Sequence, residues 1–225
     1  MIQVSDAWRK AFPGAVVGLL VMQNVTNPPE HAGLEAAKAA LEQDLRNRYG
    51  AFSKAEFNNL PSVKPYADYY DGHKKTYHVQ LQLESVAVKG KSLPHVAALV
   101  EAMFMAELKN QMLTAGHDFD SIQGEILLNV SNGDEVYTML NGKEQILKPR
   151  DMFMRDGVGI ISSVVYGPDQ RTCITPRTKN ALFVVYAPAG VGVTAVENHL
   201  NDLHRNVNII APAAKAEPLT IITAP

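Results

Sequence analysis

The sequence predicts a single α+β domain in which helices dominate the first half and short strands the second. Two long segments of helical spacing precede residue 113, and short strand-like runs separated by Asn-Gly pairs follow residue 124. Hydrophobic residues make up 46% of the 225 positions and charged residues 20%, as in an ordinary globular protein. We predict one domain over residues 1–210, with a mixed or antiparallel sheet packed on helices, and an extended tail over residues 211–225.

The first half contains one predicted strand and two predicted helices. The apolar run Val16–Gln23 follows a Pro-Gly turn and has the length of a buried strand. Residues 34–49 repeat apolar side chains at helical spacing, and residues 95–112 are apolar around nearly the whole axis, which is typical of a core helix. Between these helices, residues 53–75 contain two prolines and several tyrosines, from which we predict a turn-rich segment.

The second half consists mainly of short strand-like runs. The Asn-Gly pairs at 132–133 and 141–142 separate such runs and predict hairpins. A last helix is predicted over residues 193–205, and the tail after residue 210 is expected to be extended and to pack on the domain or trail from it. The predicted strands are 125–130, 136–140, 145–147, 159–165 and 182–186.

Charge and hydropathy exclude several classes of protein. Lys and Arg number 21 against 23 Asp and Glu, and this balance argues against a duplex DNA-binding protein while leaving room for a small basic face that holds an RNA end. The sequence shows neither a membrane-length apolar stretch nor a signal-peptide pattern. A single cysteine excludes a disulfide framework and fits a reducing compartment, so we expect a cytoplasmic protein.

Familiar catalytic and cofactor-binding motifs are missing from the sequence. It contains no GxxxxGK[ST], GxGxxG, GxSxG or HExxH pattern. His73 and His78 are five residues apart, as are His199 and His204, a spacing that puts them on different helix faces. We therefore expect neither a metal nor a cofactor, and we interpret Cys173 as an inert small hydrophobe.

Two polar clusters are the candidate functional sites. In the first, the Gly167-Pro168 turn ends the apolar run 160–165 and presents Asp169, Arg171 and Thr172 at a sheet edge. These groups form either a surface ion pair of Asp169 with Arg171 or a binding loop held by a rigid sheet.

The second cluster, Ala115–Asp120, follows the core helix. Here Gly116 is interpreted as a helix stop and Asp118 as the cap of a short turn. His117 lies beside two carboxylates, which would raise its pKa and allow it to carry a proton. Two further acidic residues, Glu84 in the alternating run 79–84 and Glu101 on the core helix, have apolar neighbours and need a partner or a cationic ligand.

These clusters carry a family resemblance. The segments LTAGHDFDSIQGEILL (113–128) and NGDEVYTMLNGKEQILKPRDMFMRDGVGIISSVVYGPDQRTCITPRTKNALFVVYAPAG (132–190) resemble the B3/B4 domain of the phenylalanyl-tRNA synthetase β subunit. They are more similar still to the standalone B3/4-domain proteins. The resemblance covers about residues 79–200 and is most specific over 154–178.

The resemblance implies an editing function. In the synthetase this domain hydrolyses the ester of tRNA that carries the wrong amino acid, chiefly tyrosine. The Thr-Asn pair of the synthetase domain aligns with Met103-Phe104 here. Its histidine aligns with Ala115, and His117 lies two residues further on. Its Gly-Gly-Glu turn aligns near Gly167–Gln170, so Asp169 corresponds to the glutamate of that turn. These departures argue against a tyrosine-shaped pocket. Some standalone relatives clear tRNA(Arg) charged with canavanine, whose oxyguanidinium suits acidic side chains.

The leading hypothesis is therefore a trans-editing aminoacyl-tRNA deacylase, with canavanyl-tRNA(Arg) as one candidate substrate and the precise substrate open. It requires that the bend after residues 160–165 and the Ala115–Asp120 junction line one cavity that admits an acceptor end. Three alternatives remain open: a tRNA-binding adaptor without hydrolysis, a deacylase for tyrosyl-tRNA(Phe), and a hydrolase of free amino-acid esters.

The hypothesis assigns residues to three roles. The catalytic groups are the backbone amides of the turn that begins at Gly167, for the oxyanion, with Asp169 or His117 to orient water. The expected substrate-binding residues are Glu84, Glu101, Asp118, Tyr166, Arg171 and Thr172. The expected phosphate contacts are Lys74, Lys75, Lys89, Lys91, Arg150 and Arg155.

Overall fold

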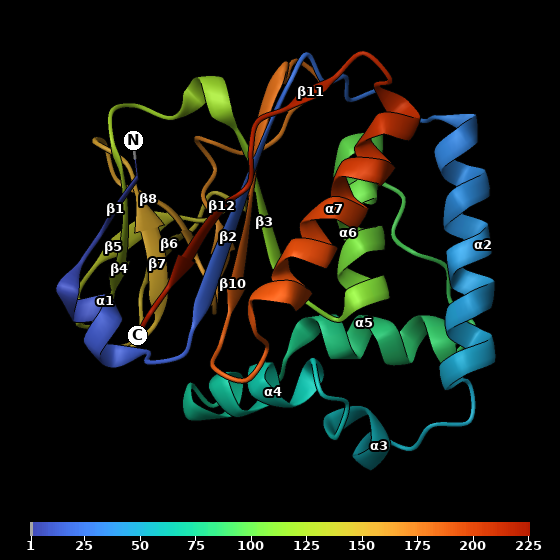
Figure 1. The fold of residues 1–225 in the computed structure, drawn as a ribbon, viewed down its shortest axis with the longest axis horizontal. Coiled ribbons are helices and arrows are strands. Elements are labelled where there is room, and N and C mark those ends of the chain that lie inside the picture. The colour runs from blue at the N-terminus through green and yellow to red at the C-terminus, as the bar shows by residue number, and fades with distance from the viewer. Residues whose placement is uncertain (1) are drawn as a thin grey trace.

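The computed structural model describes residues 2–225 and confirms the α+β fold. Figure 1 shows a central sheet with a second group of strands on one side and helices α7, α6 and α2 on the other. Helices α4 and α5 close one end of this arrangement. Across residues 2–225, no helix has both the length and the apolarity needed to cross a bilayer.

The central sheet is built on two long apolar strands. Strand β2 (Val16–Gln23), which confirms the predicted strand, pairs over its whole length with antiparallel β10 (Asn180–Ala187). The sheet order is β11-β2-β10-β3, with β3 (Thr114–Asp118) at the edge. The short strands β11 (Lys215–Ala216) and β12 (Thr220–Thr223) both pair with β2, so the tail is extended, as predicted, and packs on the sheet.

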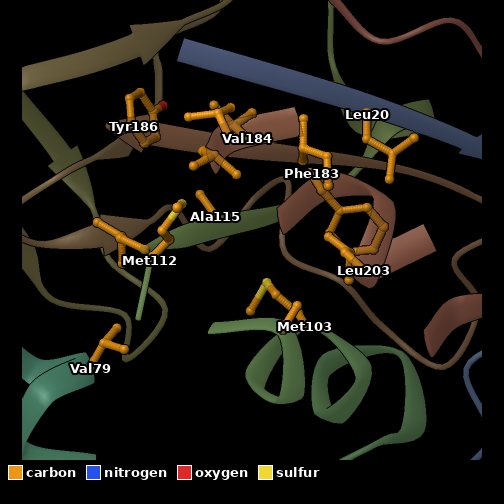
Figure 2. Close-up of a cluster of buried hydrophobic side chains, with 14 of the residues drawn as sticks. Leu20, Val79, Met103, Met112, Ala115, Phe183, Val184, Tyr186 and Leu203 are labelled. Carbon is orange, nitrogen blue, oxygen red and sulfur yellow. The ribbon is translucent and has the colours of Figure 1, made fainter. Parts of the chain in front are cut away.

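Three of the helices pack in layers beside this sheet. Helix α2 (Ala32–Tyr49) and helix α6 (Ala98–Asn110) confirm the two predicted helices, and α7 (Val193–Ile210) runs five residues beyond its predicted end. Strand β2 and α7 approach closely because Gly18 lacks a side chain: a Cβ there would lie 2.4 Å from Val196 Cγ1. Figure 2 shows Phe183 and Leu203, from β10 and α7, pointing toward one another in the core.

The prediction of a turn-rich segment over residues 53–75 is wrong. Helices α3 (Lys54–Asn58) and α4 (Val63–Gly72) lie there, and α5 (His78–Ala87) follows. Ser53 and Glu56 form a capping box for α3. Pro65 is tolerated because it lies in the first turn of α4, where a backbone N–H has no partner within the helix. The alternating run 79–84 is likewise helical.

The second sheet has the order β1-β4-β7-β8-β9. The loop at Asn141-Gly142 joins the predicted hairpin β5–β6, but the Asn132-Gly133 pair does not join a hairpin, because β4 pairs with β1 and β7 instead of β5. The helix α1 spans Asp6–Ala11. The remaining strands are β1 (Ile2–Val4), β4 (Ile126–Val130), β5 (Val136–Thr138), β6 (Glu144–Ile146), β7 (Met152–Arg155), β8 (Ile160–Ser163) and β9 (Gly167–Pro168).

Candidate functional site

A cavity of about 210 Å³ lies beside the edge strand β3. Ala115 and Gly116 of β3 line it together with Gly167 and Pro168 of β9, so the two segments singled out in the sequence meet at one cavity. Because a water molecule takes up about 30 Å³ of liquid, the volume is that of about seven waters. This volume is on the scale of a single amino-acid side chain.

Gly116 helps to keep this space open. It lies within β3 and is buried, so the expectation that it stops the preceding helix is wrong. A Cβ at Gly116 would lie 2.8 Å from Ile174 Cδ1 and 3.1 Å from Met103 Sδ. Both of these side chains line the cavity, so any residue larger than glycine would displace its walls.

One face of α6 forms an apolar wall. Val100, Met103 and Phe104 line the cavity at helical spacing, and Glu107 completes the same stripe. The Met103-Phe104 positions, where the synthetase resemblance placed a polar pair, are therefore apolar contacts. Figure 2 shows Met103 on α6 and Ala115 on β3 in the same buried cluster.

Glu107 is the residue that the sequence analysis missed. Its side chain is buried, and its Oε1 accepts a hydrogen bond of 2.7 Å from the Thr114 amide. Among the residues that the structure describes, no cationic side chain pairs with it. Burial raises the pKa of Glu107 to about 8, so the carboxyl is mostly protonated at neutral pH. The sequence could have indicated Glu107, because this acidic residue lies at helical spacing from the apolar side chains that line the cavity.

His117 is not the proton carrier expected from its neighbours in sequence. It is fully buried, and burial together with the nearby Arg171 guanidinium lowers the pKa of His117 to about 3 instead of raising it. The ring is therefore neutral at physiological pH. Nδ1 lies 2.8 Å from Thr172 Oγ1, and Nε2 lies 3.2 Å from Ser162 Oγ.

These contacts belong to a chain of hydrogen bonds that runs from Asp169 to Tyr186. The Thr172 hydroxyl donates to Asp169, so its oxygen accepts from His117 Nδ1–H, and His117 Nε2 must then accept from the Ser162 hydroxyl. Ser162 Oγ in turn lies 2.7 Å from the Tyr186 hydroxyl. The chain joins three candidate residues (Asp169, Thr172 and His117) and reaches the cavity wall at Tyr186.

Asp169 itself is held away from the cavity. It is buried and also accepts a bond from the Thr172 amide, and it does not line the cavity. Arg171 bonds chiefly to the buried Asp156, at 2.9 Å, and to the Ser121 carbonyl; its Nε lies 3.7 Å from Asp169 Oδ2. The ion pair of Asp169 with Arg171 is therefore present, but the Asp169 carboxylate is buried, so the pair does not lie on the surface.

Two amides of the Gly167–Gln170 turn, which was expected to form the oxyanion site, donate to backbone carbonyls instead. The Asp169 amide donates to the Ile161 carbonyl at 2.8 Å, and the Gln170 amide donates to the Thr138 carbonyl at 3.0 Å. Pro168 has no N–H. The turn therefore shapes the cavity through Gly167 and Pro168, while two of its donors hold the surrounding strands together.

The three other acidic candidates do not line the cavity. Asp118 caps the short helix Phe119–Ser121, as predicted, and accepts a bond from Thr178. Glu84 accepts a bond of 2.9 Å from Gln80 on its own helix. Glu101 is buried against the ammonium of Lys38, at 2.6 Å.

The Glu101 cluster is also the place where a metal would find ligands. Ligand atoms of Glu35, His95 and Glu101 lie within 4.8 Å of one another. Lys38 already bonds both Glu35 and Glu101, so its ammonium supplies the positive charge that these carboxylates need. The cluster is explained by this ion pair.

A basic and aromatic pair lies beside the cavity. The Lys75 ammonium lies over the Tyr166 ring, 4.7 Å from its centroid, and Tyr166 directly precedes the cavity-lining Gly167. Lys74 is exposed next to Lys75. Arg155 is exposed on β7 and bonds the Asp156 carbonyl, and it does not line the cavity.

Two further groups at the cavity were not assigned to a site from the sequence. His78, at the start of α5, lines it, as does the partly buried Cys173. Burial raises the pKa of the Cys173 thiol, which agrees with its interpretation as an unreactive side chain. No spacing rule could have selected His78, because its place at the cavity depends on how α5 packs.

Fold and cavity together define an α+β domain with a side-chain-sized cavity at the edge of its central sheet. Residues 66–207 match the B3/4 domain family, and the chain belongs to that family. The match begins earlier than the resemblance, which starts at residue 79, and it includes α4 from residue 66 onward.

The fold is similar to that of a solved structure. An N-terminal fragment of the phenylalanyl-tRNA synthetase β-subunit from Pyrococcus horikoshii aligns with a TM-score of 0.50 and 13% sequence identity, over 96% of this chain and 50% of that chain. This chain therefore spans half the length of that fragment. No curated protein matches the sequence.

Proposed function

We propose that the protein is a trans-editing deacylase that hydrolyses the ester of mischarged aminoacyl-tRNA. The cavity between β3 and β9 carries this proposal, because its size suits one aminoacyl side chain and its walls come from the two segments that resemble the editing module. The similar structure belongs to a protein whose name assigns it to tRNA aminoacylation, and this is consistent with a tRNA substrate here.

Glu107 favours canavanine as the amino acid to be removed. The carboxylates first expected to bind it do not line the cavity, whereas Glu107 does and is mostly protonated there. An oxyguanidine is much less basic than the guanidinium of arginine, so it can enter an apolar site uncharged and hydrogen bond to the carboxyl group. Arginine would carry its charge into the site and pay a larger desolvation cost.

The rim of the cavity supports binding of an RNA end. Lys75 and Tyr166 place a cation and an aromatic ring next to each other beside Gly167. A terminal phosphate and a terminal base could use these two groups while the aminoacyl group occupies the cavity.

The test is deacylation of defined substrates by the full chain. We expect the ester of canavanyl-tRNA(Arg) to be lost faster than that of arginyl-tRNA(Arg) or tyrosyl-tRNA(Phe), and Glu107→Gln to reduce this preference. Binding of tRNA without loss of any ester would instead identify an adaptor. Faster loss from tyrosyl-tRNA(Phe) would overturn the substrate assignment, and cleavage of free amino-acid esters alone would overturn the tRNA requirement.

A further inference from the structure

The titratable groups that line the cavity differ in their protonation state at neutral pH. Burial raises the pKa of Glu107 to about 8 and raises those of the Cys173 thiol and the Tyr186 hydroxyl, so all three are mostly protonated. His78 differs, because desolvation lowers its pKa below the usual value and leaves the ring neutral. Among the described residues that line the cavity, His78 is thus the one with a free base form.

Hydrogen bonds determine which nitrogen of His78 carries the proton. The Tyr70 hydroxyl donates to the Val164 carbonyl over 2.6 Å, which uses its single proton. The same oxygen lies 3.3 Å from His78 Nδ1 and so accepts from Nδ1–H. Nε2 of the neutral ring therefore holds a lone pair, and no hydrogen-bonding partner lies within reach of it among residues 2–225.

We propose that His78 is the general base that activates water in the cavity. This inference rests on the proposed deacylase function, and it replaces the roles first expected for His117 and Asp169, which are engaged in the buried hydrogen-bond chain. His78 as a residue is exposed to solvent, so water reaches it. Tyr70 is a positioning residue that holds the ring in the Nδ1–H form.

The step conserves atoms and charge. Nε2 of His78 takes a proton from water while the water oxygen bonds to the ester carbonyl carbon, and the carbonyl electron pair moves to oxygen. The tetrahedral intermediate then collapses and expels the ribose oxygen, which takes the proton back from the imidazolium. The products are the free amino acid and tRNA with a free terminal hydroxyl, and His78 returns to its neutral form.

The groups around His78 predict the direction of the pH dependence. Tyr70 from α4 faces the ring, with the two centroids 5.8 Å apart, and Tyr77 precedes it in the chain. Glu107 and Cys173 lie on other elements of the same cavity and are uncharged below pH 7. Lys75, three residues before His78 in the chain, has its ammonium over the Tyr166 ring. Deacylation should therefore decline as pH falls through the lowered pKa of His78, below 6.5.

Kinetics on charged tRNA provide the first test. General bases contribute about 100-fold or more, so we expect His78→Ala to lower kcat by that factor, to leave KM nearly unchanged and to remove the acidic limb. Added imidazole should restore part of the rate. The matched control is His204→Ala on α7, a histidine that contacts Asn208 at 3.0 Å; its activity should equal that of the wild type.

A second test does not depend on the substrate. Nitrogen-15 NMR of the full chain at pH 7.5 should show His78 in the Nδ1–H form, and Tyr70→Phe should shift the tautomer balance. An Nε2–H tautomer in the wild type would overturn the inference. So would a His78→Ala variant that deacylates at the wild-type rate with an unchanged pH profile, although the deacylase function would then stand. If the wild type hydrolyses no charged tRNA, the proposed function fails, and the inference fails with it.

Discussion

Replacing Glu107 with glutamine should stabilise the protein by an amount that grows with pH. Burial raises the pKa of Glu107 from the usual 4.5 to about 8. Between these values the folded state keeps a proton that the unfolded state has released, so folding becomes less favourable as pH rises. At 1.36 kcal/mol per unit, the whole interval corresponds to a loss of about 5 kcal/mol. Glutamine does not titrate and does not incur this loss.

Urea unfolding at pH 5, 7 and 8.5, followed by the fluorescence of the buried Trp8, measures the effect. The advantage of Glu107→Gln over the wild type should be small at pH 5 and should increase by several kcal/mol by pH 8.5. Glu144→Gln, at an exposed position of β6, is the matched control and should show a constant difference. A pH-independent difference for Glu107→Gln would refute the reasoning, since it would mean that the folded protein solvates or pairs the carboxylate.

The expected gain in stability also bears on function. A cost of about 5 kcal/mol is comparable to the whole stability of a small domain, which is about 5–15 kcal/mol. Strongly shifted carboxyl groups in cavities are concentrated at functional sites, because binding or catalysis compensates for their cost. An engineered gain in stability with a loss of substrate preference would link the two at this residue.

Three further outcomes are expected. Gly116→Ala places a Cβ 2.8 Å from Ile174 Cδ1, so it should destabilise the fold by about 1–3 kcal/mol in urea and weaken binding of aminoacyl analogues; unchanged binding would show that the walls yield. Lys75→Ala should weaken tRNA binding and reduce the salt slope by about 1, unlike Lys215→Ala on β11; equal slopes would exclude a phosphate contact. Burial lowers the pKa of His199 from 6.5 to about 4, so the stability that the neutral ring contributes is lost as pH falls through this range. The difference in unfolding free energy between the wild type and His199→Gln should therefore shrink by about 3 kcal/mol over the same range. A difference that stays constant would contradict this.

The elements predicted correctly were those whose pattern follows from local sequence. Val16–Gln23 is a contiguous apolar run, and α2 and α6 repeat apolar residues at helical spacing, so burial and secondary structure coincide. Strand β3 was missed because its polar residues resemble a loop. Thr114 and His117 are buried there only because distant side chains, such as His199 for Thr114, complete their hydrogen bonds. Such partners come from tertiary structure.

The candidate site was predictable in position and much less so in chemistry. The proximity of Ala115 to Gly167 followed from the motif resemblance, and both residues line the cavity. The roles of individual side chains depended on orientation. Glu101 and Glu107 lie on the same helix, yet Glu107 faces the cavity while Glu101 pairs with Lys38. Two side chains six residues apart on a helix point in different directions. The residue types alone therefore cannot show which of the two glutamates faces the cavity.

The structure separates the polar groups of the site into two sets with different tasks. One set, Asp169 with Thr172 and His117, satisfies its own hydrogen bonds and holds the β9 segment against β3. The other set, Glu107 and His78, lines the cavity, and each of these side chains makes a hydrogen bond through only one of its two polar atoms among the described residues. A group whose hydrogen bonds are already made within the protein has few left to form with a substrate. A polar group without a partner in an apolar cavity is stabilised most by a ligand that hydrogen bonds to it. The motif residues thus build the cavity, and the chemistry is assigned to residues outside the motif.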